Sequence, residues 1–342
     1  MVYSFELLKH ANIRYRDAVS VLVRCELFSM LASLDISCEI TEEEMGGSRF
    51  LSFECRELTD QELSFLSGHS SVVFLAEKKD NLLRPLPVRN ISYLPDDLPE
   101  VLKYKGKTSA VFTRMMINTA AALSAFRKQD EPLLFFDPVC GKGTGCFCAL
   151  AAGMNAAGVD LDRKDIREAA DYFSRYLKFH KLKHEEKNRS ETFGGHSLPV
   201  TVFTFSDTRE HWQAGNTRTL RLACADTCES PALFRKEQAH VIAADLPYGV
   251  QHAPRSGTKP ESLHGFLSRV LPVWKRSLRP GGTIAVSFNT LTLPSEDVRN
   301  ALAAAGFRLP QNPLFAGLRH EVEHAVVRDV VFALNTEEES YL

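Results

Sequence analysis

The chain lacks the features of a membrane-spanning or secreted protein. None of its 342 residues falls in an apolar run that approaches the roughly 20 residues of a membrane helix. Residues 1–6 do not begin the pattern of basic and then apolar residues that marks a signal peptide. We therefore expect no membrane partner and a cytoplasmic location.

A complete set of cysteines and histidines with metal-binding spacing is also missing. Cys224 and Cys228 have a spacing that fits a metal, but no second Cys or His pair with finger-type spacing accompanies them. Cys140, Cys146 and Cys148 are crowded, which favours reduced thiols in a reducing compartment. We expect no metal, and we interpret the cysteines as small buried apolar residues.

The chain has no large excess of charge of either sign. The formal net charge is −2, which excludes a protein that coats nucleic acid, but the distribution is uneven. Residues 1–100 carry ten Lys/Arg against seventeen Asp/Glu, whereas 101–130 carry six against one and 175–189 six against two. Those two basic segments are the expected contacts for a polyanion, and solvated helix faces are the alternative. Within them, 103–114 and 175–189 are expected to frame the presumed active face.

The length predicts two domains. Short apolar alternations at 50–53 and 72–75, with a helical pattern at 17–34, predict a small α+β domain over residues 1–100. A segment punctuated by prolines follows, and we place the boundary near residue 100. The four prolines are Pro85, Pro87, Pro95 and Pro99.

Strand and helix patterns alternate through the second domain, residues 101–342. Strands are predicted at 133–137, 157–160, 220–225, 240–245, 283–288 and 325–334, and helices at 108–126, from 145, at 163–180 and at 263–278. This alternation predicts an α/β fold with a doubly wound sheet whose ligands gather at the strand carboxyl ends. An inserted hairpin is expected near 185–218.

A glycine-rich turn follows the first strand of this domain. In Asp137-Pro138-Val139-Cys140-Gly141-Lys142-Gly143-Thr144-Gly145 the spacing fits neither dinucleotide binders nor phosphate loops. Glycines let a ligand approach the backbone. The leading Asp137 disfavours a pyrophosphate and suits a cationic methionine group. A tight structural turn is the alternative.

Acidic residues follow the next two strands. Asp160 has the position of a carboxylate that accepts both hydroxyls of a ribose. Asp162 competes for that role, although it also fits a helix N-cap. Asp226 is a candidate acceptor for an adenine amine, or else an ordinary turn residue.

The run Asp245-Leu246-Pro247-Tyr248 carries the expected reaction. A purine amine is a poor nucleophile, so two acceptors that hold it are more useful than a strong base. The Asp245 carboxylate and the Leu246 carbonyl supply these acceptors, Pro247 fixes the turn, and Tyr248 stacks on the base. Read alone, the run is also compatible with an ordinary loop.

The order of these motifs, from Lys105-Gly106-Lys107-Thr108 to Asp245-Leu246-Pro247-Tyr248-Gly249, resembles the S-adenosylmethionine-dependent RNA methylases related to the THUMP-associated tRNA guanosine-N2 methyltransferases. The resemblance covers roughly residues 100–335. It implies a Rossmann-like seven-stranded methyltransferase domain, S-adenosyl-L-methionine as cofactor, and RNA, most plausibly tRNA, as partner. It also places Thr108 and Arg114 near the cofactor pocket.

Residue by residue, the resemblance implies a catalytic set and a cofactor set. The catalytic set is Asp245, Leu246, Pro247 and Tyr248. The cofactor set is Thr108, Asp137, Pro138, Cys140, Gly141, Gly143, Thr144, Asp160, Leu161, Asp226, Thr227 and Asp245.

The chain departs from the family pattern in two places. Leu246 replaces the first proline of the usual Asp-Pro-Pro-Tyr run, which leaves its carbonyl in place. The first hundred residues are short for a THUMP region with its ferredoxin-like companion, so we interpret them as the companion alone, which would position RNA. Two other functions stay open: an N6-adenine methyltransferase on RNA or DNA, and a non-catalytic nucleic-acid-binding module that retains the cofactor pocket.

Overall fold

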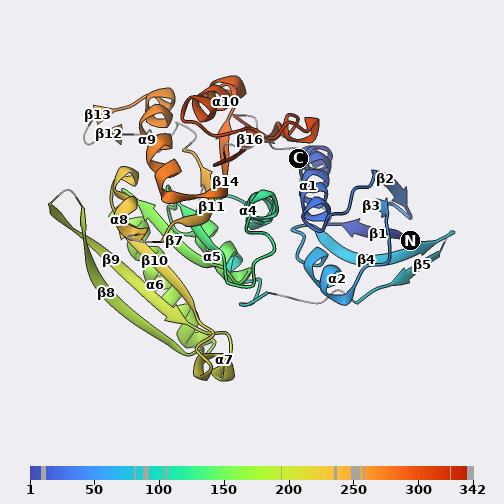
Figure 1. Cartoon of the computed structure of the whole chain (residues 1–342), viewed down its shortest axis with the longest axis horizontal. Coiled ribbons are helices and arrows are strands. Elements are labelled where there is room, and N and C mark those ends of the chain that lie inside the picture. Colours follow the sequence, from blue (N-terminus) through green and yellow to red (C-terminus); the bar gives the residue numbers. More distant parts are fainter. Residues whose placement is uncertain are drawn as a thin grey trace.

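The computed structural model describes residues 1–8, 13–80, 82–87, 92–102, 104, 107–193, 195–234, 237–247, 255–256, 259–323 and 325–336. Two units lie side by side, each with its own sheet (Figure 1). No helix among these residues is long and apolar enough to span a membrane.

The N-terminal unit is a five-stranded antiparallel sheet with two helices. Its elements are β1 (Val2–Leu7), α1 (Ile13–Ser33), β2 (Ile40–Met45), β3 (Ser48–Glu54), α2 (Asp60–Leu66), β4 (Val72–Lys79) and β5 (Leu82–Pro85). The sheet order is β2-β3-β1-β4-β5. The succession β-α-β-β-α-β in this order has ferredoxin-like topology, and β5 extends its edge.

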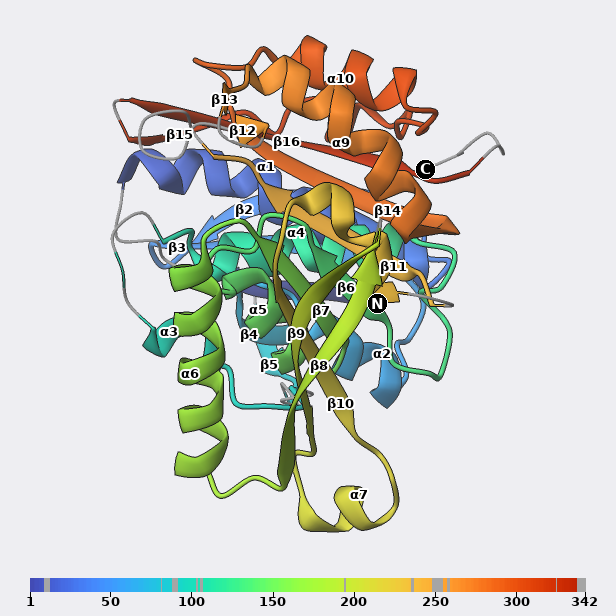
Figure 2. The same cartoon turned by 90° about the vertical axis from the view of Figure 1, so that its left-hand side faces the viewer.

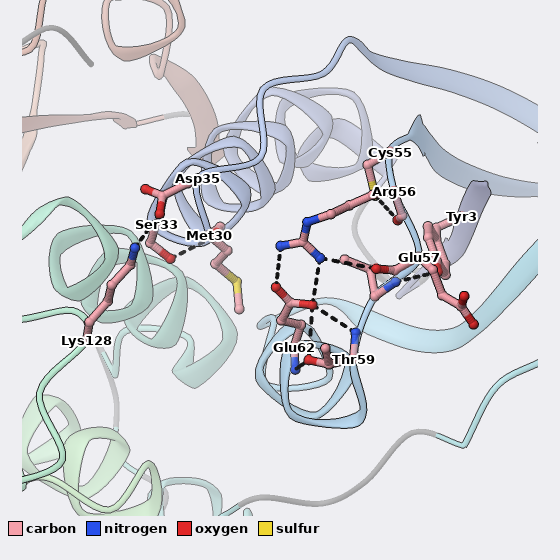
Figure 3. Close-up of polar contacts among 11 residues, drawn as sticks. Tyr3, Met30, Ser33, Asp35, Cys55, Arg56, Glu57, Thr59, Glu62 and Lys128 are labelled. Carbon is pink, nitrogen blue, oxygen red and sulfur yellow. Dashed lines mark hydrogen bonds and ion pairs between the residues drawn. The ribbon is translucent and has the colours of Figure 1, made fainter.

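A capping box fixes the start of α2. The Thr59 hydroxyl accepts a hydrogen bond from the Glu62 amide at 3.2 Å, and the Glu62 carboxylate accepts one from the Thr59 amide at 2.8 Å (Figure 3). Arg56 donates to both oxygens of Glu62, at 2.6 and 2.9 Å. The guanidinium is the main reason that the pKa of Glu62 falls to about 2. Backbone and side-chain donors thus hold the first turn of α2 in place.

Helix α1 joins the two units because it is apolar on more than one side. Leu22 and Cys25 pack into the core of the second unit, while Val23 and Leu27 pack into the core of the first. A helix with two apolar faces is stable only when both are covered. At the helix end, Asp35 pairs with Lys128 of the second unit at 2.5 Å (Figure 3).

A buried carboxylate ties the same helix to its neighbours. Glu26 is fully buried and accepts hydrogen bonds from the Ser70 amide at 2.8 Å and from the Asn118 side chain at 2.7 Å. The Ser70 hydroxyl donates at 2.5 Å, and Asn118 also donates to the Gly68 carbonyl at 2.9 Å. Because every donor comes from a different element than α1, the network fixes how the units pack.

The second unit contains most of the chain. Its elements are α3 (Leu98–Val101), α4 (Ala110–Leu123), β6 (Leu134–Asp137), α5 (Thr144–Ala151), β7 (Asn155–Asp160), α6 (Arg163–Phe179), β8 (His184–Phe193), β9 (His196–Phe205), α7 (Arg209–Gln213), β10 (Arg218–Cys224), η1 (Thr227–Glu229), α8 (Pro231–Phe234), β11 (Ala239–Asp245), β12 (Arg255–Ser256), β13 (Lys259–Pro260), α9 (Leu263–Ser277), β14 (Leu278–Asn289), α10 (Ser295–Ala304), η2 (Pro313–Phe315), β15 (His320–Glu323) and β16 (Val326–Leu334).

These strands form one mixed sheet in the order β15-β16-β14-β11-β6-β7-β10-β9-β8. The five central strands, from β14 to β10, are parallel, whereas β16 and β9 are antiparallel to their inner neighbours. The described sheet has nine strands, so the predicted count of seven is two short. The reason is that the β8–β9 hairpin pairs with β10 and lengthens the sheet instead of standing apart from it.

Helices cover both faces of this sheet, as a doubly wound fold requires. Helices α4, α5 and α6 share one apolar core with the sheet, and α8, α9 and α10 share the other (Figure 2). Leu94 and Leu98 already pack in the first of these cores, although they precede the boundary expected near residue 100. The sheet order reverses between β6 and β11, where ligands of such folds usually bind.

Candidate functional site

The glycine-rich turn lies at the carboxyl end of β6, next to the point where the sheet order reverses. Gly141 and Gly143 have positive φ values of 48° and 87°, which L side chains rarely adopt. A Cβ at Gly145 would overlap the Asp137 carboxylate, and that glycine allows α5 to begin directly against it. The turn therefore needs glycines for its own geometry and also exposes backbone close to Asp137.

Asp137 is a buried acid at the base of this turn. It accepts a hydrogen bond from the Val139 amide at 3.2 Å and is 7% exposed. Burial raises the pKa of Asp137 to about 8, and the nearby charges of Asp160 and Asp245 add to that rise. The three predicted acids are thus close enough to interact electrically, and a cation bound among them would favour their ionised forms.

Asp160 faces the glycine turn from the end of β7. One carboxylate oxygen accepts from the Gly141 amide at 2.8 Å, and the other accepts from the Asp162 amide at 2.9 Å. Asp162 instead caps α6 through the Lys164 and Asp165 amides, at 2.8 and 3.3 Å. The structure therefore separates the two candidates, since only Asp160 contacts the turn.

Leu161, next to Asp160, has an unusually exposed apolar side chain. It is 55% exposed, although the side chains that β7 directs to both faces of the sheet are buried. An apolar side chain beside a carboxylate matches what a nucleoside needs, which is a polar contact for the ribose and an apolar contact for the base.

Asp226 and Thr227 lie after β10, where the structure gives both side chains internal partners. Asp226 accepts from the Cys228 amide at 2.8 Å and pairs with Arg269 at 3.0 Å. Arg269 also pairs with Glu261 at 2.9 Å. The Thr227 hydroxyl is buried and accepts from the Trp274 indole at 2.8 Å, so it anchors α9.

Cys140 and Thr144, both expected in the cofactor set, also have structural roles. Cys140 is buried, and its sulfur lies with that of Cys146 against the backbone of Gly158. The Thr144 hydroxyl is 2.9 Å from the Tyr104 hydroxyl. Pro138 is buried between Asp137 and the turn. These side chains shape the turn, so any cofactor contact from them would come through the backbone.

Asp245 ends β11 and is held by two hydroxyl groups. Ser287 of β14, its partner in the strand register, donates to one carboxylate oxygen at 2.8 Å. Thr108 donates to the other oxygen in a short hydrogen bond. Thr108 was predicted, whereas Ser287 was missed because only strand pairing brings it opposite Asp245. A single polar residue in the apolar strand around Val286 and Phe288 is the signal that was available.

The residues after Asp245 are described only in part. The Leu246 amide donates to the Ser287 carbonyl at 2.8 Å, which continues the β11 pairing by one residue. The Leu246 side chain is 1% exposed and packs in the core beneath α9, so it contributes to the fold as well as to the turn. Pro247 is half-buried. Tyr248 lies outside the described residues, as do Lys105, Gly106 and Gly249.

A second group of residues lies on the α4 side of Asp245. His320 is buried, and burial lowers its pKa to about 4, while the Asp245 charge opposes that shift. Its ring is 5.4 Å from that of Phe112, and the Arg328 guanidinium lies 4.4 Å from the centre of the same Phe112 ring. Neutral His320 and buried Arg328 were not anticipated from the sequence.

The basic segment at 103–114 was expected at the presumed site, but two of its cations have other partners. Lys107 pairs with Glu100 at 3.6 Å, and Arg114 pairs with Asp96 at 3.2 Å. Arg114 lines a cavity of about 420 Å³ between the two units, together with Asn118. The ion pair with Asp96 and the place in this cavity are the contacts that the structure gives Arg114. No group of metal-binding side chains occurs among the described residues.

No protein-family model matches the sequence, and no curated protein matches it either. Three solved structures illustrate what the chain is similar to. TrmN from Thermus thermophilus is 14% identical, with 98% of this chain and 99% of that chain covered and a TM-score of 0.47. A SAM-dependent methyltransferase from Agrobacterium tumefaciens is 14% identical, with 66% and 61% covered and a TM-score of 0.39. A methyltransferase from Pyrococcus furiosus is 11% identical, with 69% and 88% covered and a TM-score of 0.40.

Proposed function

We propose that this chain transfers a methyl group from S-adenosyl-L-methionine to an exocyclic amine of a nucleic-acid base, namely N2 of guanosine in tRNA. The observation that carries this proposal is the Asp245 carboxylate, held by Thr108 and Ser287 at the sheet edge where Asp137 and Asp160 also lie. These residues combine an amine acceptor with carboxylates suited to a cationic nucleoside.

The residues around the glycine turn fit the proposed cofactor. Asp160 would hold the ribose hydroxyls, exposed Leu161 would cover one face of the adenine, and buried Asp137 would face the cationic methionine part. When bound, S-adenosyl-L-methionine supplies a methyl group on a positively charged sulfur. Asp226 is a weaker candidate for the adenine amine, because its carboxylate already pairs with Arg269.

Asp245 would orient the target amine. Each carboxylate oxygen can accept more than one hydrogen bond, so the bonds from Thr108 and Ser287 fix the group and leave acceptor capacity for the amine. The Leu246 carbonyl would be the second acceptor. The two acceptors would hold the amine hydrogens so that the nitrogen lone pair faces the methyl group. The cofactor would supply the methyl group and keep the sulfur electron pair, and the methylated amine would release one proton to solvent.

Guanosine N2 and adenosine N6 present the same kind of amine, so the same acceptors also serve the alternative of adenine methylation. The test is to incubate purified protein with bulk tRNA and methyl-labelled cofactor and to analyse the nucleosides by mass spectrometry. We expect labelled N2-methylguanosine. Labelled N6-methyladenosine would select the alternative, and cofactor binding without any labelled nucleoside would favour the non-catalytic module.

A further inference from the structure

Residues 175–183, the first part of the second basic segment, lie at the opposite edge of the sheet from Asp245. Helix α6 starts directly after the carboxyl end of β7 and runs back along the sheet for 17 residues, or roughly 25 Å at about 1.5 Å per residue. Its C-terminal end and α7 both lie toward the lower end of the sheet in Figure 2. The Ser206 amide donates to the Lys183 carbonyl there, at 3.0 Å. Residues 175–183 therefore do not border the presumed active face, contrary to the expectation from the sequence.

The cations at this end of α6 differ from those nearer its start. Residues 175–183 include four Lys/Arg and no Asp/Glu. No ion pair of Lys178, Lys181 or Lys183 occurs among the residues that the structure describes. Lys164 and Arg167 on the same helix, by contrast, have carboxylate partners one turn away, at 3.9 and 3.7 Å. The end of α6 thus presents positive charge that has no carboxylate partner in the described part of the chain.

An exposed aromatic ring lies among these cations. Phe179 is 81% exposed, which is unusual for a large apolar side chain. Its ring is 5.1 Å from that of His180, and the His180 ring is 4.3 Å from that of Tyr176. The Tyr176 hydroxyl donates to Asp97 at 2.7 Å, which fixes the inner end of this row of rings. The Phe179 ring therefore contacts His180 on one side, and most of its remaining surface is accessible to solvent.

We propose that Arg175, Lys178, Phe179, Lys181 and Lys183, here called the α6 end patch, bind a single-stranded segment of the RNA substrate. Unneutralised cations beside an exposed aromatic ring are the combination that holds phosphates and stacks a base with little sequence preference. The identity of the polyanion rests on the proposed function. Because the patch is separated from Asp245, a substrate that contacts both must be an RNA long enough to reach both edges of the sheet. Free nucleotides are therefore poor substrates.

Binding of a labelled oligouridylate, followed by fluorescence anisotropy over a series of salt concentrations, tests this proposal. Replacing the three lysines together (Lys178→Gln, Lys181→Gln, Lys183→Gln) should lower the salt slope by about 2, at about 0.7 for each phosphate contact on a single strand. Phe179→Ala should weaken binding about tenfold without changing the slope, and Phe179→Trp should keep it. Arg167→Gln is the matched control, because it removes one charge from the same helix where that charge is already paired.

Three results would overturn the proposal: an unchanged salt slope in the triple variant, an unchanged affinity in Phe179→Ala, or binding to anionic phospholipid vesicles in place of the oligouridylate. The methyl-transfer assay separates this inference from the proposed function. Oligouridylate binding that depends on the patch, with no methylated nucleoside from tRNA, supports the RNA contact and removes the catalytic proposal. Methylated nucleoside formed equally well by the triple variant at all salt concentrations would leave the catalytic proposal standing and remove the patch.

Discussion

The carboxyl ends and the amino ends of the parallel strands, here called the carboxyl edge and the amino edge of the nine-stranded sheet, carry opposite kinds of polar group. At the carboxyl edge, Asp160 and Asp245 each accept hydrogen bonds on both oxygens from the protein itself. At the amino edge, the lysines of the α6 end patch are exposed and have no carboxylate partner among the described residues. Groups held in fixed positions suit the recognition of a small ligand atom by atom, whereas exposed cations suit a polymer of phosphates.

Two buried carboxylates make a second comparison. Glu26, between the units, is surrounded by donors from Ser70 and Asn118, so it is satisfied inside the protein. Asp137 is buried to a similar degree but accepts one hydrogen bond, from Val139, among the described residues. A buried carboxylate with few donors is costly to ionise. The contrast indicates that Glu26 stabilises the packing of the units, while Asp137 has capacity left for a ligand.

The largest expected effect separates catalysis from cofactor binding at the carboxyl edge. Asp245→Ala should lower the rate of methyl transfer at least about a thousandfold, because the carboxylate would act on the amine in the transition state. Affinity for S-adenosylmethionine, measured by calorimetry, should change little. Full activity in this variant would show that the amine is held by other groups.

Asp160→Ala should have the reverse effect. We expect cofactor affinity to fall by about one to two decades, since the ribose would lose charge-assisted hydrogen bonds. Calorimetry at a fixed pH measures the change, and Asp162→Ala is the matched control because Asp162 caps α6 instead. Equal losses in the two variants would contradict the assignment of Asp160 to the ribose.

Glycine substitutions compare Gly145, whose backbone lies against the Asp137 carboxylate, with Gly317, which has no such neighbour. Gly145→Ala should lower the free energy of unfolding by about 1–3 kcal/mol, because its methyl group overlaps the Asp137 carboxylate. Gly317→Ala should be nearly neutral, since no atom lies within 4 Å of its Cβ position and its φ is not positive. Chemical denaturation of both variants measures the difference, and equal stability would argue against close packing of the turn.

The smallest expected effect concerns the pH dependence of cofactor binding. With its pKa raised to about 8, Asp137 is largely protonated at pH 7 and becomes ionised as the pH rises. Because the ionised form attracts a cation, cofactor affinity should rise about tenfold between pH 7 and pH 9. Asp137→Asn should remove this rise, and calorimetry across the pH range compares the two proteins. Identical pH profiles would place the cationic group of the cofactor elsewhere.

Local patterns in the sequence predicted many elements of the second unit to within a few residues. The helix expected at 163–180 is α6, and the strand expected at 240–245 is β11. Such elements are set by short-range periodicity and by caps such as Asp162, which a single sequence contains. The resemblance implied seven strands. The pairing of β9 with β10, which adds two more, depends on contacts between segments that periodicity does not contain.

The sequence by itself determined the acidic residues at the strand ends and the glycines between them, because those side chains and turns depend on residue type and local order. Only the tertiary structure decided which of them meet. Strand register brings Ser287 to Asp245, and the packing of α4 brings Thr108 to the same carboxylate. The direction of α6, a helix of 17 residues and about 25 Å, likewise carries its basic end toward the amino ends of the strands. Sequence proximity to a motif therefore does not fix the edge of the sheet on which a side chain lies, because a helix that crosses back along the sheet moves its far end to the other edge.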